Sequence, residues 1–463
     1  MLPDTKTSTL LRLARGAVRT AARSALAVGV LTAAACSPTE ILDVTDPDII
    51  NPSEVRSSAG ANAVRLGALA RLANGTSGAG EFFMLSGLFA DEWINGDSFI
   101  HRQEIDQRII TGENSFLTDA NRSIHRARLS AEQAVALLDE FSPTAPGWQK
   151  AEMYFIQAYV ANLLAEHYCN GLVFSTVRDG REEFGSPVTT TAAFETALTK
   201  ATEGLALVTG TTADDNRVRY ALQLIRGRIL LNLDRYSEAA TAVAGVPSNF
   251  EYVNRHSLGT SSNYAWLRAN SERRYNVSDG EGVNGINFAS ASDPRVPVCV
   301  GGSAACIAIQ VTQKVRDDLT SPLNVQMLWP VRESQVSILR GQEARMIEAE
   351  AKMETDPAAA LALINAARAT VSGLAPLADA GTPAARVAQL FRERAFWNFG
   401  RGARVGDMRR LVRQYGLPQA SVFPTGAWHK FGAYGSDVNF PLPQAEANNP
   451  NLSGGASCMD RNA

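Results

Sequence analysis

The sequence predicts an all-α fold in which helices pack in pairs, and three segments carry the pattern. Residues 148–168 (WQKAEMYFIQAYVANLLAEHY) place apolar and small side chains at spacings of three and four, which is the period of a helix. A second apolar stripe runs along the same segment, so we expect this helix to pack on two sides, as in layered helix pairs. Residues 219–247 and 342–369 each contain two helical patterns joined by a short turn.

These two hairpins indicate a tetratricopeptide-like scaffold. The first turns near Asp234, and the opening of its second helix, from Tyr236 to Ala239, resembles a tetratricopeptide hairpin. Small residues such as Gly227 and Ala239 allow paired helices to approach closely. In the second hairpin, Asp356 followed by proline fits the start of a helix, because proline is favoured at the first helical position.

Residues 249–337 differ in character, since Gly, Ser, Asn and Pro are interspersed there with aromatic residues. This composition predicts loops with short strands at most. Long loop segments inside compact proteins are uncommon and often functional, so we expect specificity to lie here. The predicted organisation is a single domain over residues 51–463, with helices over 51–248 and 338–415 and a closing segment over 416–463.

The N-terminus is typical of a secreted lipoprotein. Five basic residues precede an apolar run over residues 25–35, which is the layout of a secretory signal. The run is shorter than the roughly 20 residues that a membrane-spanning helix needs, so we expect residues 1–35 to be removed. Three alanines before Cys36 resemble a bacterial lipobox, which predicts lipid attachment at Cys36 and a tether over residues 36–50. The alternative is an ordinary Ala-x-Ala cleavage site beside a chance cysteine.

Four cysteines follow Cys36, and an even number in an exported protein favours disulfides over a metal site. Cys299 and Cys306 flank the flexible sequence VGGSAA and are predicted to pair. Cys169 and Cys458 would form the second bridge. The alternative for Cys169 is a small buried hydrophobic residue in a helix.

Composition and motifs exclude several functions. The formal net charge is −3, without the basic excess of a nucleic-acid-binding protein. The G-x-S-x-G and H-E-x-x-H motifs of hydrolases and metalloproteases do not occur. Residues 96–98 (GDS) resemble the opening block of GDS-type esterases, but no histidine has the aspartate three residues before it that those enzymes need. A glycosidase pair depends on separation in space, so the sequence leaves that possibility open.

Several further motifs are related to one known family. They are ILDV at residues 41–44, RGQEARMIEAEA at 340–351, LINAAR at 363–368, the segment from ER to DMRR at 393–410, and PLPQAEANNPNL at 441–452. Their order and spacing resemble those of SusD-like (SusD/RagB) outer-membrane nutrient-uptake lipoproteins. The 393–410 segment departs from the family pattern, because Arg401 stands where Glu is usual.

The resemblance implies an all-α, tetratricopeptide-like binding protein rather than an enzyme. It also implies a lipid anchor at the surface of the outer membrane. The implied partner is a TonB-dependent (SusC-like) β-barrel transporter, and the implied ligand is a glycan or another nutrient, with no cofactor. Two alternatives remain, which are a tetratricopeptide scaffold for proteins without a small ligand and an exported glycan hydrolase.

Neutral sugars expose C–H faces and hydroxyl groups, which aromatic rings and polar amides bind without charge. Aromatic residues in loop-like surroundings are therefore the candidate ligand contacts, and burial in the core is the competing interpretation of each. They are Trp93, Tyr264, Trp266, Tyr275, Trp329 and Trp428. Trp148 and Trp397 lie in helical patterns and are predicted to be core. The charged motif residues Glu343, Glu350, Arg368, Arg404 and Asp407 are expected to pair with one another and with backbone groups.

Overall fold

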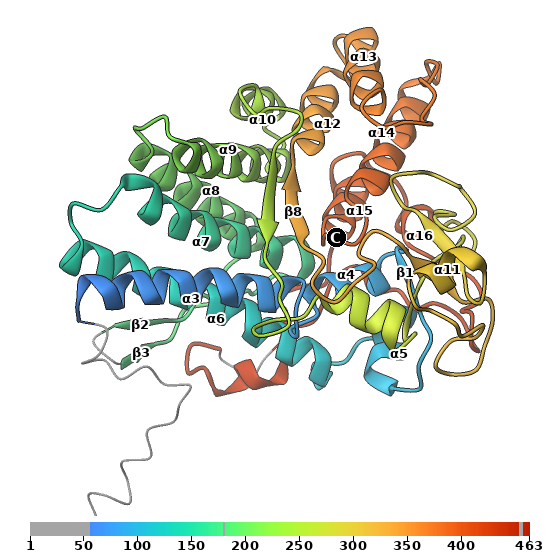
Figure 1. The fold of residues 1–463 in the computed structure, drawn as a ribbon, viewed down its shortest axis with the longest axis horizontal. Helices are drawn as coiled ribbons and strands as arrows, with labels where there is room; N and C mark the ends of the chain where they lie inside the picture. The colour runs from blue at the N-terminus through green and yellow to red at the C-terminus, as the bar shows by residue number, and fades with distance from the viewer. Residues whose placement is uncertain (1–55, 179–180, 453–456) are drawn as a thin grey trace, which may run out of the picture. The chain divides into compact units, whose positions relative to one another are not determined.

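The computed structural model describes residues 56–178, 181–452 and 457–463, of which residues 57–463 form one compact unit. Helices dominate this unit, and its strands are short (Figure 1). The predicted all-α fold class is therefore confirmed. The signal sequence, Cys36 and the tether lie outside the described residues.

The scaffold is a series of helices, each packed on its neighbours. In chain order they are α3 (Ser58–Thr76), α6 (Ser115–Phe141), α7 (Gly147–His167), α8 (Thr190–Leu207), α9 (Ala213–Asn232), α10 (Tyr236–Val243), α12 (Gly341–Lys352) and α13 (Pro357–Arg368). Helix α3 packs on α6, α6 on α7, and the series continues through α8, α9 and α10 to α12 and α13 (Figure 1). The helix predicted over residues 148–168 is α7, and each predicted hairpin is a helix pair.

The first pair, α9 and α10, shows why these residues make a tight hairpin. A capping box between Thr212 and Asp215 begins α9. The turn contains Asp234 in the left-handed region, at φ 62°. A Cβ added to Gly227 would lie 2.3 Å from a methyl carbon of Val243, so glycine is what lets the two helices come this close. The role predicted for Gly227 is confirmed.

The second pair, α12 and α13, begins and packs as predicted. Asp356 caps α13 by accepting a hydrogen bond from the backbone N–H of Ala359 at 3.0 Å, and proline follows at the first helical position. The core between the pair also receives α14 (Pro383–Trp397), whose Trp397 is buried, as predicted. Helix α15 (Arg404–Arg413) follows and packs against α7.

Short antiparallel strand pairs connect the loop-rich part to the scaffold. The pairs are β1 (Trp93–Asn95) with β5 (Tyr275–Val277), β2 (Thr176–Arg178) with β3 (Arg181–Glu183), β4 (Glu251–Asn254) with β8 (Val336–Arg340), and β6 (Val298–Val300) with β7 (Asn324–Gln326). The register of the first pair places Trp93 opposite Val277. This pair joins residues 93–95, which lie between α3 and α6 in the sequence, to residues 275–277 in the loop-rich part.

Short helices complete the architecture. They are α4 (Phe82–Phe89), α5 (Ile100–Gln107), the π-helix η1 (Trp266–Ser271), α11 (Ala304–Ala308), α16 (Gln419–Val422) and the 3-10 helix η2 (Gln444–Asn448). Residues 249–337 thus hold short strands, as expected, together with η1 and α11.

The described residues form two disulfides. Cys299 pairs with Cys306, with their Cα atoms 5.5 Å apart, around a small apolar core that includes Val325. Cys169 follows the end of α7 and pairs with Cys458 near the C-terminus, with Cα atoms 5.7 Å apart. Among the described residues, no helix combines the length and the apolar character that crossing a bilayer requires.

Candidate functional site: an exposed loop face

Four of the six aromatic residues predicted as ligand contacts are buried. The ring of Trp93 packs on Phe399 at a centroid distance of 4.8 Å, and Trp329 lies beneath the guanidinium of Arg401 at 5.3 Å. The other two, Tyr275 and Trp428, donate hydrogen bonds to buried carboxylates. Their local sequence is that of loops, but long-range packing encloses them, because large aromatic rings gain most by leaving water.

The two carboxylates that hold the other buried rings are Glu81 and Asp106. Tyr275 donates its hydroxyl to Glu81 at 3.2 Å, and Trp428 donates its indole N–H to Asp106 at 3.0 Å. In the described structure these four aromatic side chains therefore offer no exposed face to a ligand.

Tyr264 and Trp266 remain partly exposed at the start of η1. Asn263 positions this turn, because its side-chain oxygen accepts from the backbone N–H of Trp266 at 3.1 Å and its amide donates to the carbonyl of Ser334 at 2.8 Å. The guanidinium of Arg268 lies 5.0 Å from the ring centre of Tyr264. This arrangement holds the tyrosine ring by a cation–π contact at the surface.

A line of alternating charges leads from Tyr264 to another exposed ring, Phe99. Arg268 pairs with Glu272 at 2.5 Å, and Glu272 pairs with Arg274 at 3.4 Å. The guanidinium of Arg274 then lies 5.0 Å from the ring centre of Phe99. Phe99 is 47% exposed. Sequence reasoning missed Phe99, and the only available signal was its position after the polar turn GDS at residues 96–98.

Three loops meet beside Phe99 through their backbones. The N–H of Gly96 donates to the carbonyl of Arg274 at 2.7 Å, and the N–H of Asp318 donates to the carbonyl of Gly96 at 2.8 Å. A Cβ at Gly96 would lie 2.7 Å from the amide nitrogen of Asn276, so this approach requires glycine. The loops at 96–99, 273–276 and 317–318 therefore form one continuous surface.

Lys430 adds a fourth loop to this surface. Its ammonium group donates to the backbone carbonyl of Asp97 and pairs with the carboxylate of Asp318 at 2.9 Å. Beside this junction, Phe431 is 75% exposed and Leu319 is 79% exposed. We call this surface the loop face, and it comprises Phe99, Tyr264, Trp266, Glu272, Arg274, Leu319, Lys430 and Phe431.

A buried ionic network supports the loop face from below. Arg102 pairs with Asp97 at 2.9 Å and with Glu81 at 3.2 Å, and Glu81 also accepts from Arg268. Burial lowers the pKa of Arg268, but hydrogen bonds to Glu81 and Glu272 raise it more, so the net shift is upward. Arg268 therefore stays charged and holds the ring of Tyr264 at the surface.

The charged residues of the C-terminal motifs serve the structure, as expected. Arg404 makes a bidentate pair with Asp91 at 2.7 and 2.9 Å, and Asp407 makes one with Arg394 at 2.7 and 2.8 Å. Glu350 pairs with a buried arginine and accepts from the hydroxyl of a tyrosine. Glu343 lies 3.8 Å from Arg228. These side chains are buried and do not reach the loop face.

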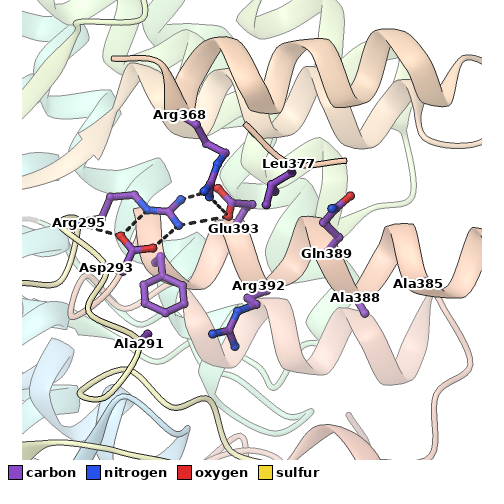
Figure 2. Close-up of a pocket in the computed structure, with 11 residues that line it drawn as sticks. Ala291, Asp293, Arg295, Arg368, Leu377, Ala385, Ala388, Gln389, Arg392 and Glu393 are labelled. Carbon is purple, nitrogen blue, oxygen red and sulfur yellow. Dashed lines mark hydrogen bonds and ion pairs between the residues drawn. The ribbon is translucent and has the colours of Figure 1, made fainter. Parts of the chain in front are cut away.

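The fifth motif residue, Arg368, belongs to a cavity of about 480 Å³ beside α14. Figure 2 shows Arg295 between Asp293 and Glu393, and Arg368 reaching the same glutamate. Arg295 pairs with Asp293 at 2.6 Å, and Arg368 pairs with Glu393 at 2.6 Å. Both carboxylates in this cavity are thus neutralised by protein groups. We therefore place the candidate functional site at the loop face instead.

Solved structures with this fold are known. A SusD superfamily protein from Parabacteroides distasonis superposes with a TM-score of 0.63 at 14% identity, over 88% of this chain and 99% of its own. A SusD-like carbohydrate-binding protein from Bacteroides fragilis gives 0.62 at 15% identity, over 86% and 99%. A SusD superfamily protein from Bacteroides thetaiotaomicron gives 0.59 at 14% identity, over 85% and 98%.

No family model matches the sequence, and no curated protein matches it either. The class that the structure defines is a tetratricopeptide-like helical scaffold carrying a loop-rich surface. This chain has the SusD-like fold over most of its length, as the C-terminal motifs predicted.

Proposed function

We propose that the protein binds a carbohydrate at the loop face and delivers it to a TonB-dependent transporter in the outer membrane. A protein with the same fold is described as carbohydrate-binding, which supports the ligand class. The observation that carries the proposal is the joining of exposed aromatic rings by paired charges on loops that meet at Lys430. It supports a binding role.

The chemistry of the loop face suits a sugar chain. Phe99 and Phe431 offer apolar ring surface to the C–H faces of a sugar, and Tyr264 adds a ring with a hydroxyl group. Arg274 and Glu272 stand between these rings and offer donors and acceptors to hydroxyl groups. Because Glu272 and Arg274 are paired with each other, a neutral ligand meets no uncompensated charge from them.

A glycan array tests the ligand class. The wild-type protein should give saturable binding to at least one glycan, and the double variant Phe99→Ala, Tyr264→Ala should bind it at least tenfold more weakly. The control is Leu66→Ala, which removes an exposed apolar side chain on α3, outside the loop face. If the wild type binds no glycan, or if the double variant binds as tightly as the control, the loop face is not a carbohydrate site. Release of reducing ends during incubation would indicate hydrolysis instead of binding.

Two experiments test the location and the partner. Replacing Cys36 with Ser should release the protein from the outer membrane, and unchanged attachment would contradict lipid anchoring. Purification from gently solubilised outer membranes should recover a large TonB-dependent barrel, identified by mass spectrometry. If the protein comes alone under conditions that preserve other complexes, a free-standing binder or a protein scaffold replaces the delivery role.

A further inference from the structure

A second cavity lies against the scaffold, between α6, strand β3 and η2. It encloses about 420 Å³, a size typical of small-molecule sites. Helix α6 contributes His125 and Arg126, the end of β3 contributes Glu182 and Phe184, and η2 contributes Glu446 and Asn448. None of these residues belongs to the loop face.

Five of the polar side chains that line this cavity have no polar partner among the described residues. Within the described parts of the chain, the side chains of Glu182, Glu446, Asn448, Arg126 and His125 form no hydrogen bond or ion pair with one another or with other residues. His125 and Glu446 are half-buried, and polar groups at that depth normally find partners, so these two call for water or a ligand. Glu182, Arg126 and Asn448 are exposed at the rim of the cavity.

In two other cavities the carboxylates are already paired. In the cavity of about 570 Å³ beside Trp148, Glu152 accepts from Arg65 at 2.9 Å and from Tyr252 at 3.0 Å, and it also pairs with Arg217. Trp148 is half-buried in this cavity, so the prediction that it lies in the core is wrong. The guanidinium groups of Arg65 and Arg217 cover its ring instead of apolar side chains. As in the cavity of Figure 2, the carboxylates between these arginines are already paired.

The unused groups include both donors and acceptors. Arg126 donates, the two glutamates accept, and the amide of Asn448 does both. Burial, and then the neighbouring Arg128, lower the pKa of His125 to about 3, so its imidazole is neutral and offers one donor and one acceptor. Each hydroxyl of a sugar also donates and accepts, which matches such a mixed lining without requiring charge on the ligand.

An aromatic ring and a rigid frame complete the cavity. Phe184 is 40% exposed and presents a ring to the opening. The chain around it is fixed, because Asn449 donates to the carbonyl of Gly185 at 3.0 Å and Asn451 donates to the carbonyl of Phe184 at 2.7 Å. The closing segment thereby holds the end of β3 in place, and the binding groups face a preformed cavity.

We propose that this cavity is a second glycan-binding subsite, separate from the loop face, which takes neutral sugar units against Phe184, Glu182, Glu446 and Asn448. The proposal rests on the carbohydrate-binding function proposed above. Two subsites on one rigid unit raise the retention of a long or branched glycan, because the second contact becomes intramolecular once the first has formed.

The test uses titration calorimetry with a hexasaccharide of the glycan that gives the strongest signal on the array. The wild-type protein should bind two hexasaccharides. The variant Phe184→Ala, Glu446→Ala should bind one, and so should the loop-face variant Phe99→Ala, Tyr264→Ala. The matched control is Glu113→Ala, which removes an exposed glutamate outside the cavity and should leave two sites.

Hydrogen exchange gives a readout that needs no variant, in case Glu446→Ala impairs folding. In the wild type, the hexasaccharide should slow exchange in residues 181–186 and 444–449 as well as at the loop face. Protection of the loop face alone, or a single site that the cavity variant leaves unchanged, overturns the second subsite and keeps the proposed function. Absence of glycan binding by the wild type overturns both.

Discussion

Replacement of Glu92 by Gln should make the protein's stability markedly less dependent on pH. Glu92 precedes β1 in the core, with its side chain fully buried. One carboxyl oxygen accepts from the backbone N–H of Gly400 at 2.9 Å, and the other has no hydrogen-bond partner among the described residues. Burial, with a further contribution from the neighbouring Asp91, raises the pKa of Glu92 to about 8, and the hydrogen bond from Gly400 lowers it only in part.

The sign follows from proton linkage. Between the usual value of 4.5 and a pKa of about 8, the folded protein keeps a proton on Glu92 that the unfolded chain has released. The free energy of unfolding therefore decreases as pH rises through this interval. One pKa unit corresponds to about 1.4 kcal/mol, so this group alone removes at most roughly 4 to 5 kcal/mol between the two limits.

Urea denaturation at pH 5, 6, 7, 8 and 9 measures the effect. The Gln side chain keeps the acceptor for Gly400 and does not titrate. The free energy of unfolding of Glu92→Gln relative to wild type should therefore rise by more than 1 kcal/mol per pH unit, until it levels near pH 8. Glu113→Gln, at an exposed position, provides the control for general charge effects. A difference that stays constant from pH 5 to 9 would refute the reasoning.

Four further predictions test other parts of the structure. Removing both cysteines of the Cys169–Cys458 bridge should lower the free energy of unfolding by about 3 kcal/mol more than removing both of the Cys299–Cys306 bridge. The reason is that the two bridges close loops of very different length, with sequence separations of 289 and 7 residues. Equal losses in urea denaturation would contradict this loop-entropy account. Gly96→Ala should lower the free energy of unfolding by about 1 to 3 kcal/mol. Gly259→Ala is the control and should not lower it, because no atom lies within 4 Å of the added Cβ. Similar values for the two variants would show that the loops at Gly96 adjust freely. Lys430→Met should speed hydrogen exchange in residues 96–99 and 317–320, whereas Lys200→Met, which breaks an exposed pair on α8, should not. Burial raises the pKa of Asp318, but hydrogen bonds from Thr320 and Lys430 lower it more, so this pair should persist on acidification to about pH 4 and be lost only below it; loss near pH 6 would count against that assignment.

The sequence was sufficient to predict the helical scaffold, because its signals are local. The apolar period of α7, the turn at Asp234 and the proline after Asp356 each lie within one or two elements, and the structure has them where expected. The small residue Gly227 likewise predicted a close approach of two helices that are adjacent in the chain.

The burial or exposure of the aromatic residues could not be predicted in this way. Trp93 lies in a strand of three residues, and both its strand partner Val277 and the ring of Phe399 that covers it are distant in the sequence. A loop-like context therefore says little about burial. Phe99 was missed for the converse reason, since its exposure depends on the meeting of loops at Gly96 and Lys430.

The second cavity could not be predicted from the sequence either. Neither Glu182 nor Glu446 indicates a binding site in the sequence, because exposed glutamates are common on solvated surfaces. They line the same cavity only because the closing segment returns to the end of β3. The motif over residues 441–452 predicted the fold without revealing that its glutamate and asparagine border a cavity.

The bridge between Cys169 and Cys458 also bears on resistance to proteolysis. It closes residues 169–458, which include the loops around η2 and every residue of the loop face except Phe99, into one covalent ring. A protease that cuts a single exposed peptide bond inside this ring leaves both fragments attached, so no piece of the binding surface diffuses away. Such a nicked molecule would migrate as one chain on a non-reducing gel and as two after reduction. The protein would thus stay in one piece after a single cut between residues 169 and 458.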